Sequence, residues 1–96
     1  MPKKVKRSEA SIESATRDYA IKKGCLVYKL GQNSEPDRLY ISPSGVCGFY
    51  EHKKEGEKPR PLQLHELSKL RKQNCVASWG DSLQHAKAFI DDLCNS

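Results

Sequence analysis

The feature that most constrains the fold is a pair of short β-prone runs separated by a tight turn. Residues 36–41 and 46–53 are rich in aromatic and branched side chains, and the four residues between them are Ser-Pro-Ser-Gly. This pattern predicts a β-hairpin. In an antiparallel pair the start of the first strand lies beside the end of the second, so we expect Asp37 and Glu51 to meet. Lys53 lies two residues beyond Glu51, so its side chain should leave the same face of the strand.

The rest of the chain alternates between helical and extended patterns. Apolar residues recur every three or four positions in three segments, and two further short apolar runs are present. These patterns predict helices over 8–23, 60–73 and 83–93, and strands over 25–30 and 76–79. The order helix, three strands, helix, strand, helix predicts an α/β fold with a small mixed sheet flanked by helices. We expect one domain over 8–96, after a basic N-terminal arm over 1–7.

The same patterns predict which side chains are buried. Apolar side chains on one side of each helix should face the core, and in the helix over 60–73 these are Leu62, Leu64, His65, Leu67 and Leu70. Cys25 and Cys47 lie inside apolar runs and are expected to be reduced core residues. His52 is expected to point away from Glu51 and Lys53, as a surface or interface residue.

The charge of the chain indicates a polyanionic partner. Seventeen basic residues against 12 acidic ones give a formal charge of +5, and residues 1–7 carry four bases and no acid. Nucleic acid is the usual partner of such a chain, although a solvated basic surface would give the same composition. The four cysteines form no Cys-x-x-Cys pair, which argues against a zinc finger. With no membrane span and no signal peptide in the sequence, we expect a cytoplasmic protein.

The predicted meeting of two carboxylates and an amine suits chemistry at phosphate. Mg²⁺ and Mn²⁺ prefer oxygen ligands, so Asp37 and Glu51 could anchor such an ion while waters fill its remaining positions. A bound ion of this kind polarises a phosphate and supplies hydroxide near neutral pH. Lys53, on the same strand face, could orient or deprotonate the attacking water or stabilise developing charge.

These residues also carry a family resemblance. Pro36-Asp37 followed by Glu51-x-Lys53 resembles the PD-(D/E)xK nuclease signature. Over residues 8–93 the chain resembles the VRR-NUC family (virus-type replication-repair nucleases), and is close to its single-domain members from phages and prophages. The motifs that carry this resemblance are Glu9-x-x-Ile12-Glu13, Tyr28-Lys29-Leu30, Pro36-Asp37-Arg38-Leu39, Phe49-Tyr50-Glu51-His52-Lys53, residues 56–63 and Ser82.

The resemblance implies a restriction-endonuclease-like αβββαβ(α) core with a specific set of site residues. Asp37, Glu51 and the backbone carbonyl of His52 would bind a divalent metal, and Lys53 would be the catalytic lysine. Gln63 matches the family's helix glutamine. An acid on the first helix would complete the site, and Glu9 and Glu13 both fit, with Glu9 preferred. The family usually has a glycine just before Pro-Asp, where this chain has Asn33-Ser34-Glu35.

The resulting hypothesis is a Mg²⁺- or Mn²⁺-dependent DNA endonuclease with no small-molecule cofactor and no membrane partner. We expect selectivity for branched DNA, such as a Holliday junction or flap, in phage or prophage replication, recombination or repair. A homodimer would bury more surface for so small a chain and present two active sites. A catalytically silent DNA-binding module of the same fold is the alternative. The side chains expected to bind DNA are Lys3, Lys4, Lys6, Arg7, Lys29, Arg38, Lys54, Lys58 and Arg60.

Overall fold

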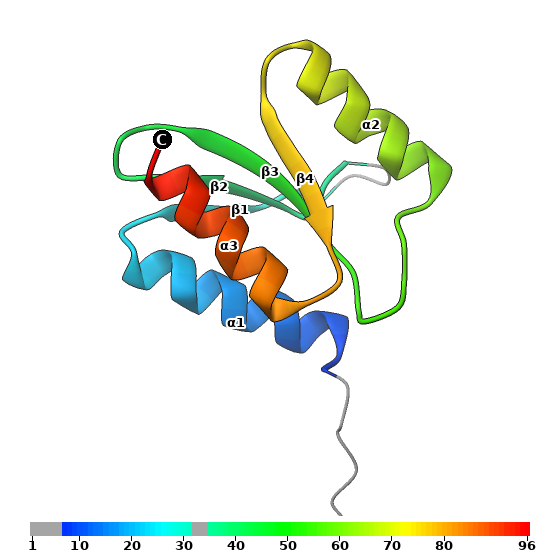
Figure 1. The fold of residues 1–96 in the computed structure, drawn as a ribbon, viewed down its shortest axis with the longest axis horizontal. Helices are drawn as coiled ribbons and strands as arrows, with labels where there is room; N and C mark the ends of the chain where they lie inside the picture. The colour runs from blue at the N-terminus through cyan, green and yellow to red at the C-terminus, as the bar shows by residue number, and fades with distance from the viewer. Residues whose placement is uncertain (1–6, 32–34) are drawn as a thin grey trace, which may run out of the picture.

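The computed structural model describes residues 7–31 and 35–96, so Lys3, Lys4 and Lys6 of the predicted arm lie outside the described residues. The described part of the chain forms three helices and four strands in the predicted order (Figure 1). These elements are α1 (Glu9–Lys22), β1 (Leu26–Lys29), β2 (Arg38–Ile41), β3 (Cys47–His52), α2 (Pro61–Lys72), β4 (Val76–Gly80) and α3 (Leu83–Cys94).

The strands form one mixed sheet in the order β1-β2-β3-β4, which confirms the predicted fold class. β1 pairs with β2 and β2 with β3 in antiparallel fashion, whereas β3 and β4 run parallel and are joined by α2. The hairpin register pairs Arg38 with Tyr50. The turn closes through a hydrogen bond from the Gly45 N–H to the Ser42 carbonyl (2.9 Å), with Gly45 at a φ of 90°. Glycine adopts this left-handed conformation without the penalty that a side chain would bring.

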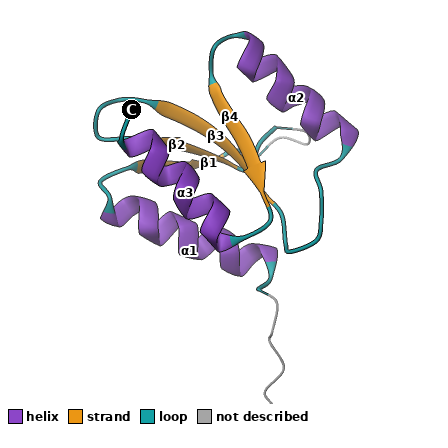
Figure 2. Cartoon of the chain, in the orientation of Figure 1, coloured by secondary structure: helices purple, strands orange, loops and turns teal. Residues whose placement is uncertain are grey.

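Two helices cover one face of the sheet. α1 and α3 pack side by side, and α2 lies apart from them beside β4 (Figures 1 and 2). A Cβ added to Gly48 would lie 2.8 Å from Phe89 of α3, so Gly48 faces that helix. Because side chains alternate along a strand, Tyr50 and His52 face α3 as well, and Glu51 leaves the opposite face. The Glu51 side chain thus leaves the sheet on the face away from the core beneath α1 and α3.

Helices α1 and α3 each begin at a serine that caps the first turn. The Ser8 hydroxyl accepts the Ser11 N–H and the Ser82 hydroxyl accepts the His85 N–H, both at 3.0 Å. These side chains satisfy backbone donors that the first turn of a helix leaves unpaired. Among the described residues, no helix is long and apolar enough to span a membrane.

Three burial predictions are wrong. In α2 only Leu67 of the predicted side is fully buried, whereas Leu62 and Leu64 are 64% and 43% exposed. The helix contacts mainly β4, so it buries a narrow strip along Gln63 and Leu67. His65 is exposed for the same reason.

The other two corrections concern the hairpin. Cys47 is exposed, because it lies on the sheet face that α1 and α3 do not cover. His52 is fully buried instead of lying at the surface. Its Nε2 is hydrogen-bonded to the Tyr40 hydroxyl at 2.8 Å, and its ring lies 4.7 Å from that of Tyr50. As a polar residue, His52 was expected at the surface. It is buried because it lies on the same face of β3 as Tyr50.

Candidate active site

Asp37 and Glu51 meet at the mouth of the hairpin, as predicted, and each binds the backbone of the other's strand. The Asp37 N–H donates to Glu51 Oε1 at 3.1 Å, and the His52 N–H donates to Asp37 Oδ2 at 2.8 Å. This follows from the register, because the pairing of Arg38 with Tyr50 sets Asp37 opposite Glu51. The two carboxylates are therefore fixed by main-chain bonds.

Lys53 joins this pair from the end of the same strand. Its Nζ lies 3.4 Å from Glu51 Oε2, and the two side chains are only 13% and 1% exposed. The Lys53 N–H donates to the Gly80 carbonyl of β4 at 2.9 Å, which extends the parallel pairing by one residue. The predicted cluster of two carboxylates and an amine on one strand face is present.

Burial changes the electrostatics of the carboxylates. Loss of water around Glu51, helped by the nearby Asp37 charge and opposed by Lys53, raises its pKa to about 7. Burial also raises the pKa of Asp37, and the hydrogen bond from the His52 N–H opposes this change. Glu51 Oε2 is buried and accepts no hydrogen bond from any described residue, although Lys53 lies within ion-pair distance. The cluster therefore sets two carboxylates against one ammonium, and one oxygen of Glu51 lacks a hydrogen-bond donor.

The first helix brings its two acids close to the cluster in different ways. Burial and the Asp37 charge raise the pKa of Glu9, while Lys53 lowers it, so its carboxyl is within electrostatic reach of both. Glu13 instead accepts a hydrogen bond from Arg38 Nε at 2.6 Å in a largely buried ion pair. In the described part of the chain no such partner engages Glu9. Of the two acids, Glu9 is thus the one with a free carboxylate.

Gln63 has a structural role at the start of α2, and its predicted role in the active site stays a prediction. The side chain is 7% exposed, and its Oε1 accepts the Arg60 N–H at 2.8 Å at the start of α2. No hydrogen bond or ion pair among the described residues joins Gln63 to Asp37 or Glu51.

The side chains expected to bind DNA differ in their surroundings. Arg38 is paired with Glu13 and only 15% exposed, so its guanidinium supports the site from within. Lys54 is exposed and lies 3.3 Å from Glu57. The remaining described members of the set are exposed: Arg7, Lys29, Lys58 and Arg60.

The residues of the cluster fit a hard divalent cation. Two carboxylates converge, and a buried oxygen of Glu51 lacks a hydrogen-bond donor. Across residues 7–31 and 35–96, no group of three or more His, Cys, Asp or Glu side chains is arranged to hold a metal ion. A cation at this point would therefore have two carboxylates as its main protein anchors, with backbone oxygen or water around them, as Mg²⁺ commonly has.

A mixed sheet of this topology with Asp37, Glu51 and Lys53 at the hairpin mouth defines the PD-(D/E)xK class of nuclease folds. The comparisons with known proteins narrow the class. A solved structure described as a VRR_NUC domain is 30% identical and aligns with a TM-score of 0.79, over 88% of this chain and 97% of that one. A protein of Acyrthosiphon pisum secondary endosymbiont phage 1, named "Putative nuclease p44", is 42% identical over 65 residues, which are 65% of this chain and 70% of the phage protein.

The chain belongs to the VRR-NUC family, as the sequence motifs indicated. No family model matches the chain.

Proposed function

We propose that the protein is a Mg²⁺- or Mn²⁺-dependent endonuclease that hydrolyses DNA phosphodiester bonds. The observation that carries this proposal is the pair of converging carboxylates, half-buried Asp37 and buried Glu51, with Lys53 beside them. Carboxylates facing a phosphate repel it unless a cation intervenes. The family and the name of the phage relative support nuclease chemistry at this cluster.

Asp37 and Glu51 would hold the cation, with the backbone carbonyl of His52 as a further ligand, and the Glu9 carboxylate would act on the cation through a bound water. When bound, such a cation polarises the scissile phosphate and lowers the pKa of water at the site. The main-chain bonds to Glu51 Oε1 and Asp37 Oδ2 leave one oxygen of each carboxylate to face the cation. These bonds keep the two anchors in place without a cost in side-chain entropy on binding.

Lys53 is the residue best placed to act on the reacting groups. Its ammonium is held beside Glu51 in a largely buried position, where an electrostatic contact is stronger than in water. From there it would orient the attacking water or stabilise the charge that develops on the phosphate. Gln63, with its Oε1 bound to the Arg60 N–H, would offer its amide N–H₂ group to the same water or phosphate.

We propose that DNA is recognised by its backbone and shape rather than by its bases. The exposed cations of the predicted set, Arg7, Lys29, Lys54, Lys58 and Arg60, suit phosphate contacts. Selectivity for branched DNA, a Holliday junction or flap, would follow from the geometry of these contacts. Such a substrate fits a role in phage or prophage replication, recombination or repair.

A homodimer would serve such a substrate. The edge strand β1 exposes Leu26 and Tyr28, which are 56% and 51% exposed and lie on the same face of the strand. Exposed apolar groups of this kind are typical of an interface. A two-fold dimer would carry two active sites, as paired cuts in a symmetric junction require.

Cleavage of labelled DNA tests the proposal. Linear duplex, single strand, flap and four-way junction are incubated with Mg²⁺, Mn²⁺ or EDTA, with the wild type, Asp37→Ala and Asp92→Ala. Asp92 is an exposed acid on α3 and controls for the loss of one carboxylate. We expect the wild type and Asp92→Ala to cut in the presence of the cation and Asp37→Ala to be inactive.

The choice of substrate then decides the selectivity. Preferential cutting of the flap or junction would support selectivity for branched DNA, and equal rates on linear duplex would refute it. Binding without cutting of any substrate by folded wild-type protein would instead identify a DNA-binding module.

A further inference from the structure

Two hollows open on the molecular surface next to α1, and they share Arg7. The first has a volume of about 290 Å³ and lies between α1 and α3. The second, of about 340 Å³, lies between the start of α1 and the loop after β3. We call the two together the α1–α3 groove. Its lining includes Arg7, Lys22, Lys87, Asp18 and Tyr19 in the first hollow, and Arg7, Ser8, Lys54 and Glu55 in the second.

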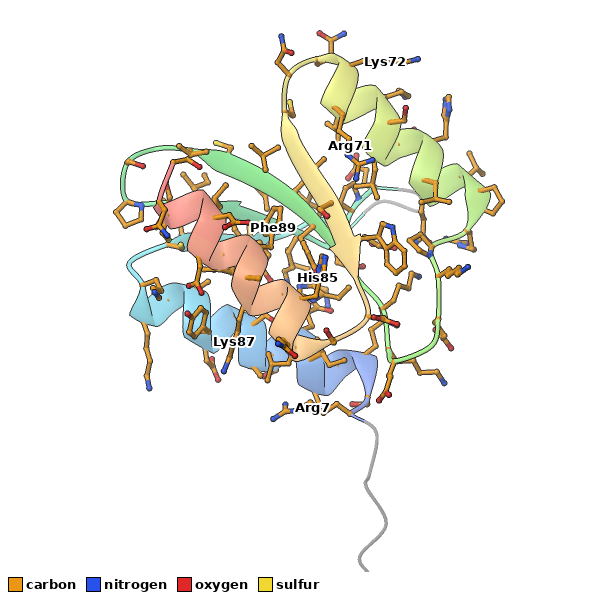
Figure 3. All side chains as sticks on the ribbon, viewed as in Figure 1. Arg7, Arg71, Lys72, His85, Lys87 and Phe89 are labelled. Atoms are coloured by element: carbon orange, nitrogen blue, oxygen red, sulfur yellow. The ribbon has the colours of Figure 1, made fainter. Side chains whose placement is uncertain are left out.

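The groove is positively charged. Three cations, Arg7, Lys22 and Lys87, line the first hollow against the single carboxylate of Asp18. Figure 3 shows Arg7 and Lys87 on the α1–α3 side of the molecule, with Lys72 at the far end of α2. Lys22 and Lys87 were absent from the set of DNA-binding residues predicted from the sequence, because their shared surface depends on the packing of two distant helices.

A fixed aromatic ring holds Lys87 in the groove. Lys87 Nζ lies 5.1 Å from the centre of the Tyr19 ring. The Tyr19 hydroxyl donates to Asp91 Oδ1 at 2.5 Å, and Lys23 lies 3.2 Å from the same carboxylate. The ring therefore cannot turn freely, and its face attracts the Lys87 ammonium. Asp91 is paired with the Lys23 ammonium, which offsets its negative charge beside the groove.

The second hollow is lined by chain neighbours of two residues of the candidate active site. Ser8 and Lys54 in the second hollow directly adjoin Glu9 and Lys53 in the chain. From there α1 extends for 14 residues to Lys22, a length of about 21 Å at roughly 1.5 Å per residue. One strand of B-DNA advances about 3.4 Å per nucleotide. The groove could thus follow about six nucleotides of one strand.

We propose that the α1–α3 groove binds the sugar-phosphate backbone of the DNA strand on one side of the bond to be cut. This inference rests on the proposed function and adds a binding surface to it. Lys22 and Lys87 would each contact a phosphate and read no base, and Arg7 would join this surface to the active site. Its length predicts that DNA must extend about six nucleotides past the cut for full affinity.

The test is DNA binding in EDTA, where no cation-dependent cleavage occurs. Fluorescence anisotropy compares the wild type with Lys22→Gln/Lys87→Gln, and with Lys69→Gln/Lys72→Gln as a control. The control removes the same charge from α2, beside β4 and away from α1 and α3. The groove variant should bind at least about tenfold more weakly at 0.1 M salt, and the slope of log K against log salt should fall by about 1.8, or 0.9 for each lost phosphate contact.

Equal losses of affinity in the groove variant and the α2 control would overturn the proposal, because net charge would then explain both. The proposal would also be overturned if the affinity lost by the groove variant were the same for short DNA and for DNA that extends about six nucleotides past the cut. Binding that requires the groove, in a protein that cuts nothing with Mg²⁺ or Mn²⁺, would support the inference while rejecting the nuclease. Cleavage by the wild type with unchanged DNA binding by the groove variant would support the nuclease and reject the groove as a binding surface. If the wild type binds no DNA at all, both proposals are rejected.

Discussion

Replacing Glu51 with glutamine should stabilise the metal-free protein at high pH. Glu51 is 1% exposed, and its pKa is raised to about 7 from the ordinary value of 4.5. The folded state therefore binds a proton that the unfolded state releases between these two pH values, so the unfolding free energy falls as pH rises across this range. At about 1.4 kcal/mol per pH unit, the loss is about 3 kcal/mol, complete by about pH 8. Because Asp37 lies beside Glu51, the pH dependence that is measured reports on the two carboxyl groups together.

Glu51→Gln keeps the shape of the side chain and removes this titration. In EDTA, the variant and the wild type should be similarly stable near pH 5, and the variant should be more stable by about 3 kcal/mol at pH 8. Urea denaturation followed by the fluorescence of Trp79, the single tryptophan, measures this difference. Trp79 pairs with Glu51 across β3 and β4, so it reports on the strand that carries the site.

Glu55→Gln, at an exposed position, controls for the loss of one carboxylate. The same difference in stability between wild type and Glu51→Gln at pH 5 and at pH 8 would refute the reasoning. Addition of Mn²⁺ at 100 times its Kd should close most of this gap at pH 8, because such a ligand stabilises the folded state by about 2.7 kcal/mol. The wild type should gain this stability and Glu51→Gln should gain much less.

Three further predictions follow from individual contacts. Lys53→Ala should lower the single-turnover rate of DNA cleavage by orders of magnitude and keep Mn²⁺-dependent thermal stabilisation; an unchanged rate would remove the lysine from the mechanism. Gly80→Ala should destabilise the protein by about 1–3 kcal/mol in urea denaturation, because the added methyl would meet the Tyr50 hydroxyl and the His85 ring; Gly31→Ala, where nothing lies within 4 Å, is the control. Tyr40→Phe should cost about 1–3 kcal/mol by the same assay, because it leaves the buried His52 Nε2 without its partner, and wild-type stability would contradict this.

The hairpin and its charged cluster were predictable because both depend on local rules. The turn at Ser42 to Gly45 fixes which residues lie opposite each other, and the two-residue repeat of a strand places Glu51 and Lys53 on one face. The caps at Ser8 and Ser82 are local in the same sense. No distant part of the chain is needed for these inferences.

The buried side of α2 was not predictable because it depends on distant packing. Leucines at positions 62, 64, 67 and 70 allow more than one apolar stripe, and the sequence does not state how far the sheet extends beneath the helix. Because α2 contacts mainly β4, only the strip at Gln63 and Leu67 is covered. The sequence also could not choose between Glu9 and Glu13, since the ion pair of Glu13 with Arg38 joins α1 to β2 across 25 residues.

The contact between Cys25 and Cys94 is a further case of distant packing. Their Sγ atoms lie 3.5 Å apart, although 69 residues separate them in the chain. Nothing in the spacing of the four cysteines indicates this pair. By contrast, the burial of His52 was predictable from the sequence, because side chains alternate along a strand and Gly48, Tyr50 and His52 therefore share the face opposite Glu51.

The rate of DNA cleavage by Asp37→Asn tests the central claim most directly. This substitution keeps the shape of the side chain and an oxygen for the His52 N–H, so the protein should fold. Single-turnover cleavage of a labelled four-way junction is measured with Mn²⁺, with the wild type beside it and with circular dichroism as the check on folding. We expect the wild type to cut and Asp37→Asn to lose cleavage by orders of magnitude. Equal rates for the two proteins would contradict the assignment of Asp37 and Glu51 as the centre of a metal-dependent nuclease.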